Sequence, residues 1–301
     1  MKASEFEAKF EAGEDLTPNL DLSRARRPNR RPTQVLCYVV GDSRNPDDVR
    51  PSAVPYRVDE EEIFFGPCAK LLRERMRTRY LAEATGSVEL RDDVYFVGFN
   101  ASNESRICKI IWIGKLMKVM TFSHAWEFLD GCRYQEMRAW EYSPLHVRPI
   151  RNGGRLVGYE HVNRLHEEDN DWVSDLVKSK SSPHVERSGN RLLLKKHVSA
   201  WRGFPRDVCL LFENVFFATG SGLEIDDDLL SILRATQPDR SVDRYAVFGR
   251  NARGDRDGKR GNYLPVTGEL AGRFVNWIRN KSSVLPSSTG PDRMPAPPPR
   301  C

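Results

Sequence analysis

Hydrophobic residues gather in short continuous runs in the middle of the chain, and these runs predict buried strands. The segments 34–40, 63–65, 94–99 and 107–119 are rich in valine, isoleucine and aromatic residues, as are strands that are buried on both faces of a sheet. The run 208–218 has the same character. The polar stretch between the third and fourth runs is short and rich in turn-forming residues, which favours a hairpin.

Other segments carry apolar residues at helical spacing. We expect a helix over 67–80, because Pro67 suits a first helical turn and leucines recur on one side. Ser123 and Asp226 are placed to cap two further helices, and Thr267 is placed to cap a closing one. Paired strands with interspersed helices, in place of regular alternation, predict an α+β fold on a curved sheet or partly open barrel.

The two ends of the chain differ in composition from its middle. Residues 1–33 mix charges of both signs with three prolines, which predicts a disordered basic arm. Residues 281–301 are rich in serine and proline, which predicts a disordered tail. We interpret residues 34–280 as a single α+β domain.

The composition excludes several classes of protein. The 301 residues are 39% hydrophobic and contain no apolar run of the length that a membrane-spanning helix needs, and the N-terminus lacks the apolar stretch of a secretory signal. The six cysteines are scattered without CxxC spacing, which argues against a paired-cysteine zinc site. We therefore expect reduced thiols in a cytoplasmic protein that has no cofactor and does not associate with a membrane.

A glycine-rich basic segment, residues 250–261, is the most distinctive charged feature of the chain. The net charge of +5 permits nucleic-acid binding without demanding it. Flexible basic loops contact phosphates without reading sequence, so we expect a phosphate-binding loop here. An ordinary charged surface loop is the alternative. The candidate phosphate-binding residues are Arg250, Arg253, Arg256, Lys259 and Arg260.

Histidines and acidic residues are densest over 159–171. Their oxygen and imidazole groups suit a divalent metal, so His161, His166 and Asp171 are candidate metal ligands. The two histidines lie five residues apart, however, and not at the i, i+4 spacing that places two ligands on one helix face. A solvated acidic turn with one hydrogen-bonded histidine is the alternative.

Several spaced blocks give the chain a resemblance to a known family. Over about residues 34–250 it resembles the nucleotide-modification-associated domain family of bacteria and phages, which is similar to the PUA, ASCH and EVE-like barrels that hold nucleobases. The blocks are the strand through Gly98 with the apolar strand and helix start at Thr121 that follow it, the run 158–161 followed by 171–176, and the strand 209–218 followed by Gly220 and Gly222.

The resemblance implies a ring-lined pocket that receives a planar base. Bases stack on aromatic rings and are read at their edges by amide groups. The candidates for base binding are Tyr38, Asn100, Trp112 and Tyr159, with Phe64 and Phe65 as further walls. The alternatives are that the aromatic rings fill the core and that Asn100 bonds its own backbone at a turn.

We therefore expect a protein that recognises a modified nucleobase in DNA, within a bacterial or phage modification or restriction system. Its partners would be nucleic acid and a nuclease or modification enzyme. The first alternative is a metal-dependent enzyme that acts on nucleic acid or nucleotides through the 159–171 cluster. The second is a non-catalytic protein adaptor.

Overall fold

The chain divides into two compact units, Met1–Pro32 and Thr33–Cys301, and the architecture below is that of the second. The computed structural model describes residues 12, 33–40, 55–81, 86–90, 92–100, 107–129, 132–166, 171–218, 222–250 and 263–282. The predicted arm, tail and phosphate-binding loop therefore lie almost wholly outside the described residues.

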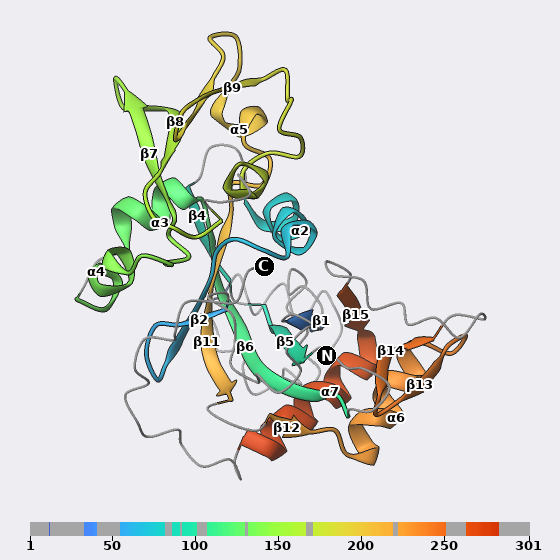
Figure 1. Cartoon of the computed structure of the whole chain (residues 1–301). Coiled ribbons are helices and arrows are strands. Elements are labelled where there is room, and N and C mark those ends of the chain that lie inside the picture. The colour runs from blue at the N-terminus through green and yellow to red at the C-terminus, as the bar shows by residue number, and fades with distance from the viewer. Residues whose placement is uncertain are drawn as a thin grey trace. The chain divides into compact units, whose positions relative to one another are not determined.

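A mixed sheet forms the centre of the second unit (Figure 1). Its strands follow the order β15–β1–β5–β6–β11–β3–β2, and β12 and β4 also pair with β6. The β1–β5 pair is parallel, and the other pairs are antiparallel. The strands are β1 (Gln34–Val40), β2 (Tyr56–Arg57), β3 (Glu62–Phe65), β4 (Ser87–Glu89), β5 (Val94–Asn100), β6 (Lys109–Met120), β11 (Cys209–Phe217), β12 (Leu223–Glu224) and β15 (Tyr263–Thr267).

Both faces of this sheet are buried, because consecutive residues of β1 enter two different cores. Val35 and Cys37 pack with residues of α6 (Asp227–Thr236) and α7 (Gly268–Ser282). Leu36 and Tyr38 pack in a second core, with residues of α2 (Lys70–Tyr80). Strands buried on both faces need apolar side chains at every position, which explains the continuous runs in the sequence.

A smaller antiparallel sheet, β7–β8–β10–β9, packs over a third core. Its strands are β7 (Val147–Asn152), β8 (Arg155–His161), β9 (Val185–Ser188) and β10 (Arg191–Leu194). The helices of this region are α3 (Phe122–Phe128), α4 (Cys132–Ala139), α5 (Ala200–Gly203) and the 3₁₀ helix η2 (Asp171–Asp175). Two further strands, β13 (Ser241–Asp243) and β14 (Ala246–Arg250), pair with each other and form a third, two-stranded sheet.

The α+β class and the hairpin of β5 and β6 are confirmed. The order of the large sheet runs from β15 to β2 without closing into a barrel over the described strands. Two predicted boundaries were wrong: α2 begins at Lys70 and not at Pro67, and Thr121, not Ser123, caps α3 by accepting a bond from the His124 amide. None of the helices in the described part has the length and apolar character needed to cross a membrane.

Candidate functional site

The loop between β3 and α2 places Cys68 at the start of a helix. Gly66 and Pro67 end the apolar strand, and the backbone then turns through two residues of left-handed conformation, Cys68 (φ 66°) and Ala69 (φ 39°). This conformation is uncommon for residues other than glycine and is enriched at functional sites. A sharp strand-to-helix turn presents the Cys68 side chain, which is half-buried, at the N-terminus of α2.

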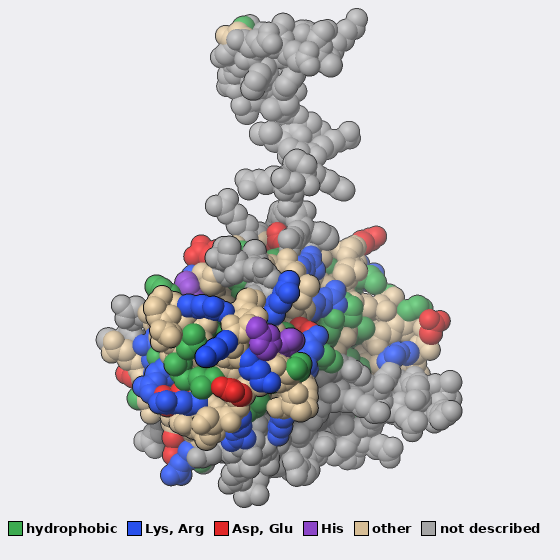
Figure 2. Space-filling model, turned by 90° about the horizontal axis from the view of Figure 1, so that it is seen from above, with side chains coloured by type: hydrophobic (Ala, Val, Ile, Leu, Met, Phe, Trp, Pro, Cys, Tyr) green, Lys and Arg blue, Asp and Glu red, His purple; other side chains and the backbone are tan. Residues whose placement is uncertain are grey.

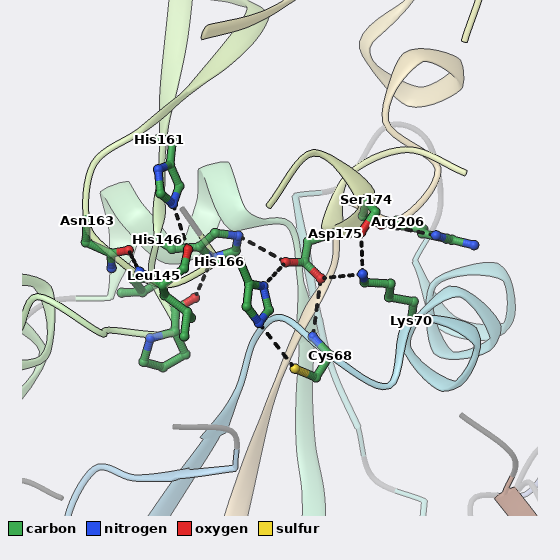
Figure 3. A network of polar contacts seen from close by, with 12 residues as sticks. Cys68, Lys70, Leu145, His146, His161, Asn163, His166, Ser174, Asp175 and Arg206 are labelled. Atoms are coloured by element: carbon green, nitrogen blue, oxygen red, sulfur yellow. Dashed lines mark hydrogen bonds and ion pairs between the residues drawn. The ribbon is translucent and has the colours of Figure 1, made fainter. Parts of the chain in front are cut away.

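A second loop, which follows β8, carries His166 to the same place. Asn163 ties this loop together, because its side-chain oxygen accepts a bond from the Leu165 amide and its side-chain nitrogen donates to the Ser143 carbonyl. His166 also has a left-handed backbone (φ 61°). Its Nε2 atom lies 3.8 Å from the Cys68 sulfur (Figure 3).

Asp175 joins the two loops. This carboxylate ends η2 and is fully buried. One oxygen, Oδ2, accepts a bond from Nδ1 of His166 at 2.9 Å, and the other, Oδ1, accepts one from the Cys68 backbone amide at 3.3 Å. In the neutral tautomer in which Nδ1 of His166 donates to Asp175, Nε2 carries no proton and can accept one from the Cys68 thiol.

Arg73 and Lys70, both on α2, bring positive charge to Asp175. Arg73 is fully buried, and its guanidinium lies 3.3 Å from Oδ1 of Asp175. It also donates to the carbonyls of Cys68 (2.8 Å), Arg206 (2.9 Å) and Val208 (2.6 Å). Lys70 lies 3.8 Å from the same carboxylate oxygen and bonds the Ser174 hydroxyl. The guanidinium therefore fixes the backbone around the site as well as balancing its charge.

Two further histidines lie beside this group. His146 is fully buried, and its Nδ1 bonds the Pro144 carbonyl. Its Nε2 is 3.4 Å from Oδ2 of Asp175, yet it has no hydrogen-bond partner among the residues that the structure describes. His161 stacks on Trp172 and bonds the Leu165 carbonyl through Nε2.

These contacts shift the pKa values of the buried groups. Burial by itself would raise the pKa of Asp175, but the neighbouring rings of His146 and His166 hold it well below its ordinary value. Burial lowers the pKa of His146 and lowers that of His161 to about 4. Asp175 is therefore ionised at neutral pH, while His146 and His161 are neutral.

The arrangement has the three parts that nucleophilic catalysis needs. Cys68 supplies a thiol, His166 supplies a base within reach of it, and Asp175 orients that base. A thiolate, which is the attacking form of cysteine, is stabilised at helix N-termini and beside cations. The α2 helix begins two residues after Cys68, and the guanidinium of Arg73, which donates to the Cys68 carbonyl, supplies a cation beside this residue.

The residues predicted to bind a base lie in two separate cores. Trp112 is fully buried, stacks on Phe65 and donates to the Tyr38 hydroxyl at 2.8 Å. Tyr159 is also fully buried, in the other core, and donates to Asp207 at 2.6 Å. The Asn100 side chain accepts a bond from the Lys109 amide across the hairpin. The structure thus brings Tyr38 and Trp112 together and places Tyr159 apart from them.

Two of the predicted metal ligands, His161 and His166, both lie beside His146 but make different contacts. His166 joins Cys68, whereas His161 faces Trp172, and the side chain of Asp171 lies outside the described part. Among the described residues, no three His, Cys, Asp or Glu side chains form a group that could hold a metal ion. Of the predicted phosphate-binding residues, only the Arg250 backbone, at the end of β14, is described; the Arg250 side chain, Arg253, Arg256, Lys259 and Arg260 are not.

Cys68 and Asp175 were missed as site residues by the sequence analysis, although one signal was present. Cys68 follows a buried strand and a Gly-Pro turn and precedes a helix, a context in which a side chain is well presented. His166 was singled out as a metal ligand and not as the base for a thiol.

Comparisons of the chain with protein-family models, with curated proteins and with solved structures find no match.

Proposed function

We propose that this protein is a thiol-dependent enzyme in which Cys68 attacks an electrophilic carbon of the substrate. The observation that carries the proposal is the continuous contact from the Cys68 sulfur to His166 Nε2 and from His166 Nδ1 to Asp175. The left-handed backbone at both Cys68 and His166 supports it, because such strain is concentrated at functional sites.

The first chemical step follows from this order of contacts. The sulfur of Cys68 forms a bond to carbon while its proton passes to Nε2 of His166, and the leaving group departs with the electron pair of the bond that breaks. Asp175 stabilises the imidazolium that His166 becomes. The imidazolium then gives this proton to the leaving group. Water attacks the carbon of the covalent adduct while His166 accepts a proton from that water, the bond between sulfur and carbon breaks, and the Cys68 sulfur takes the proton back from His166 as the thiol is regenerated.

Acetylation by p-nitrophenyl acetate tests the proposal directly. We expect a burst of p-nitrophenolate and a gain of one acetyl group on Cys68, located by mass spectrometry of peptides. We also expect iodoacetamide to modify Cys68 at pH 7 faster than it modifies glutathione, by up to about 30-fold, since a free thiol is only a few per cent ionised at that pH.

The matched controls are Cys68→Ala and Cys209→Ala. Cys209 is fully buried, with a sulfur that contacts the carbonyls of Met120 and Thr121, and burial raises the pKa of its thiol. Loss of the burst in the first variant and its retention in the second is the expected pattern. A Cys68 that reacts with both reagents no faster than glutathione contradicts the proposal.

A second candidate function is the predicted recognition of a modified nucleobase. The observation that favours it is the position of Tyr38, whose hydrogen-bonded pair with Trp112 belongs to the core against which Cys68 packs. Binding of modified and plain oligonucleotides to the Cys68→Ala variant tests this candidate, and equal affinities for both would argue against it.

A further inference from the structure

Exposed basic side chains gather at one end of the small sheet, where β9 begins and β10 ends. The segments 176–185 and 194–202 contain five lysine or arginine residues and no aspartate or glutamate. Four of these side chains are exposed, and Lys195 is half-buried. We call this set the basic rim; its members are Lys178, Lys180, Lys195, Lys196 and Arg202.

Backbone contacts hold the two segments of the basic rim side by side. The Lys195 amide donates to the His184 carbonyl at 3.0 Å, and the rings of His184 and His197 lie 6.5 Å apart. Arg202 follows on α5, whose first turn is capped by Ser199. Figure 2 looks at the molecule from above, where several blue Lys and Arg side chains lie around purple histidines, with fewer red Asp and Glu side chains beside them.

The basic rim lies next to the Cys68 site. Lys178 follows Asp175 by three residues and pairs with Glu74 on α2, the helix that begins beside Cys68. Arg206 reinforces this connection, because it donates to the Ser174 carbonyl and lies 3.6 Å from the same glutamate. The Lys178 end of the rim therefore lies against α2, the helix that begins two residues after Cys68.

The side chains of the basic rim indicate which kind of polyanion it would bind, a membrane surface or a nucleic acid. Membrane-surface sites combine cations with apolar side chains that insert into the lipid. The large exposed hydrophobic side chains among the described residues are Leu71, Ile107, Phe128, Val162 and Tyr245, and none of them belongs to the two segments of the basic rim. Several long cationic side chains on loops suit the evenly spaced phosphates of a nucleic acid.

We propose that the basic rim binds the phosphate backbone of a nucleic-acid strand and delivers that strand to the Cys68 site. The inference deepens the second candidate function, because a protein that reads a base also needs a surface for the backbone. It adds a binding surface different from the predicted loop around Arg250 to Arg260. It does not depend on covalent chemistry at Cys68.

Fluorescence anisotropy with a labelled, unmodified single-stranded oligonucleotide tests the rim on the full chain. The test variant is Lys195→Gln/Lys196→Gln/Arg202→Gln, measured at roughly 50 and 200 mM salt. We expect at least a tenfold loss of affinity at the lower salt concentration. We also expect the slope of log affinity against log salt to become shallower by about 2, since each contact to a single strand contributes about 0.7.

The matched control is Lys109→Gln/Lys115→Gln/Lys118→Gln, which removes the same charge from β6. These lysines pair with Glu224, Asp93 and Glu89, so binding should stay within about twofold of wild type. A rim variant that binds like wild type overturns the inference, as does wild-type binding to polyglutamate or anionic vesicles that is tighter than to the oligonucleotide. The binding of modified against plain oligonucleotides is measured separately. The rate of Cys68 alkylation should be unchanged in the rim variant, so a failure of nucleic-acid binding can be distinguished from a failure of the proposed enzyme function.

Discussion

The Cys68 sulfur and Nε2 of His166 lie 3.8 Å apart although 98 residues separate the two in the chain. Each of these residues has a left-handed backbone and lies in a segment that follows a strand, one after β3 and the other after β8. The contact is possible because Asp175 bonds the backbone of Cys68 and the ring of His166 at once. A single buried carboxylate therefore sets the distance between the thiol and its base.

Replacing His166 should lower the reactivity of Cys68 without removing the thiol. In His166→Asn the side chain can still bond Asp175 but cannot accept the thiol proton. We expect the rate of Cys68 alkylation by iodoacetamide at pH 7 to fall by about tenfold. The exposed His184 supplies the control variant, His184→Asn, which should react like wild type. An equal rate in the two variants would show that His166 is not the base.

The buried guanidinium of Arg73 should be a large contributor to stability. In Arg73→Lys, an ammonium group cannot reach four carbonyls and a carboxylate in the planar geometry of arginine. We expect the free energy of unfolding in urea to fall by about 3 kcal/mol, within the range for breaking a buried charge pair. Arg75→Lys is the control, because Arg75 is half-buried and its hydrogen bond is to the Tyr263 hydroxyl. A loss of unfolding free energy in Arg75→Lys as large as that in Arg73→Lys would contradict the argument.

Stability should decrease as the pH falls from 7 to 5. The folded state lowers the pKa of His161 to about 4, chiefly by burial, so between pH 6.5 and 4 the unfolded chain binds a proton that the folded chain does not. His146, whose pKa burial also lowers, acts in the same direction. Asp175 contributes nothing over this range, because its folded pKa lies well below 3.8 and its unfolded value is also below pH 5.

Urea unfolding at the two pH values measures this effect. After allowance for solvent screening, we expect His161 to account for about 1–2 kcal/mol of the loss. His161→Gln should reduce the difference between pH 7 and pH 5 by that amount. A variant whose pH dependence matches wild type would mean that His161 titrates near its ordinary pKa in the folded protein.

The close contact of Gly98 with Trp112 should make Gly98→Ala destabilising. A Cβ atom at Gly98 would lie 2.2 Å from Nε1 of Trp112 and 2.7 Å from a methyl group of Val40. The indole is held in place by its bond to Tyr38 and its stacking on Phe65, so it has little room to move. We expect a loss of about 1–3 kcal/mol in the free energy of unfolding.

Gly272 on α7 is the matched control, because nothing lies within 4 Å of the Cβ that would be added there. Gly272→Ala should leave stability unchanged or raise it by about 0.5–1 kcal/mol, since alanine favours a helix interior. Tolerance of alanine at Gly98 would show that the Trp112 ring can shift, as a ring in a base-binding pocket would have to do.

The large sheet was predictable because burial on both faces leaves a direct record in the sequence. Continuous apolar runs gave β1, β5, β6 and β11, and the Asp226 cap of α6 was also confirmed by its bond from the Leu229 amide. The small sheet was not predicted. Strands such as β7, in which most side chains face solvent, contain too few apolar residues to show a period.

The sequence by itself determined which segments become strands and helices of the main sheet, because local hydrophobicity decides that choice. It also contained every member of the basic rim, but in two segments that only the pairing of β9 with β10 brings together. Cys68, His166 and Asp175 come from three separate segments, and no local pattern links them. Only the tertiary structure placed them in contact, because a buried carboxylate must find hydrogen-bond donors and those available came from distant parts of the chain.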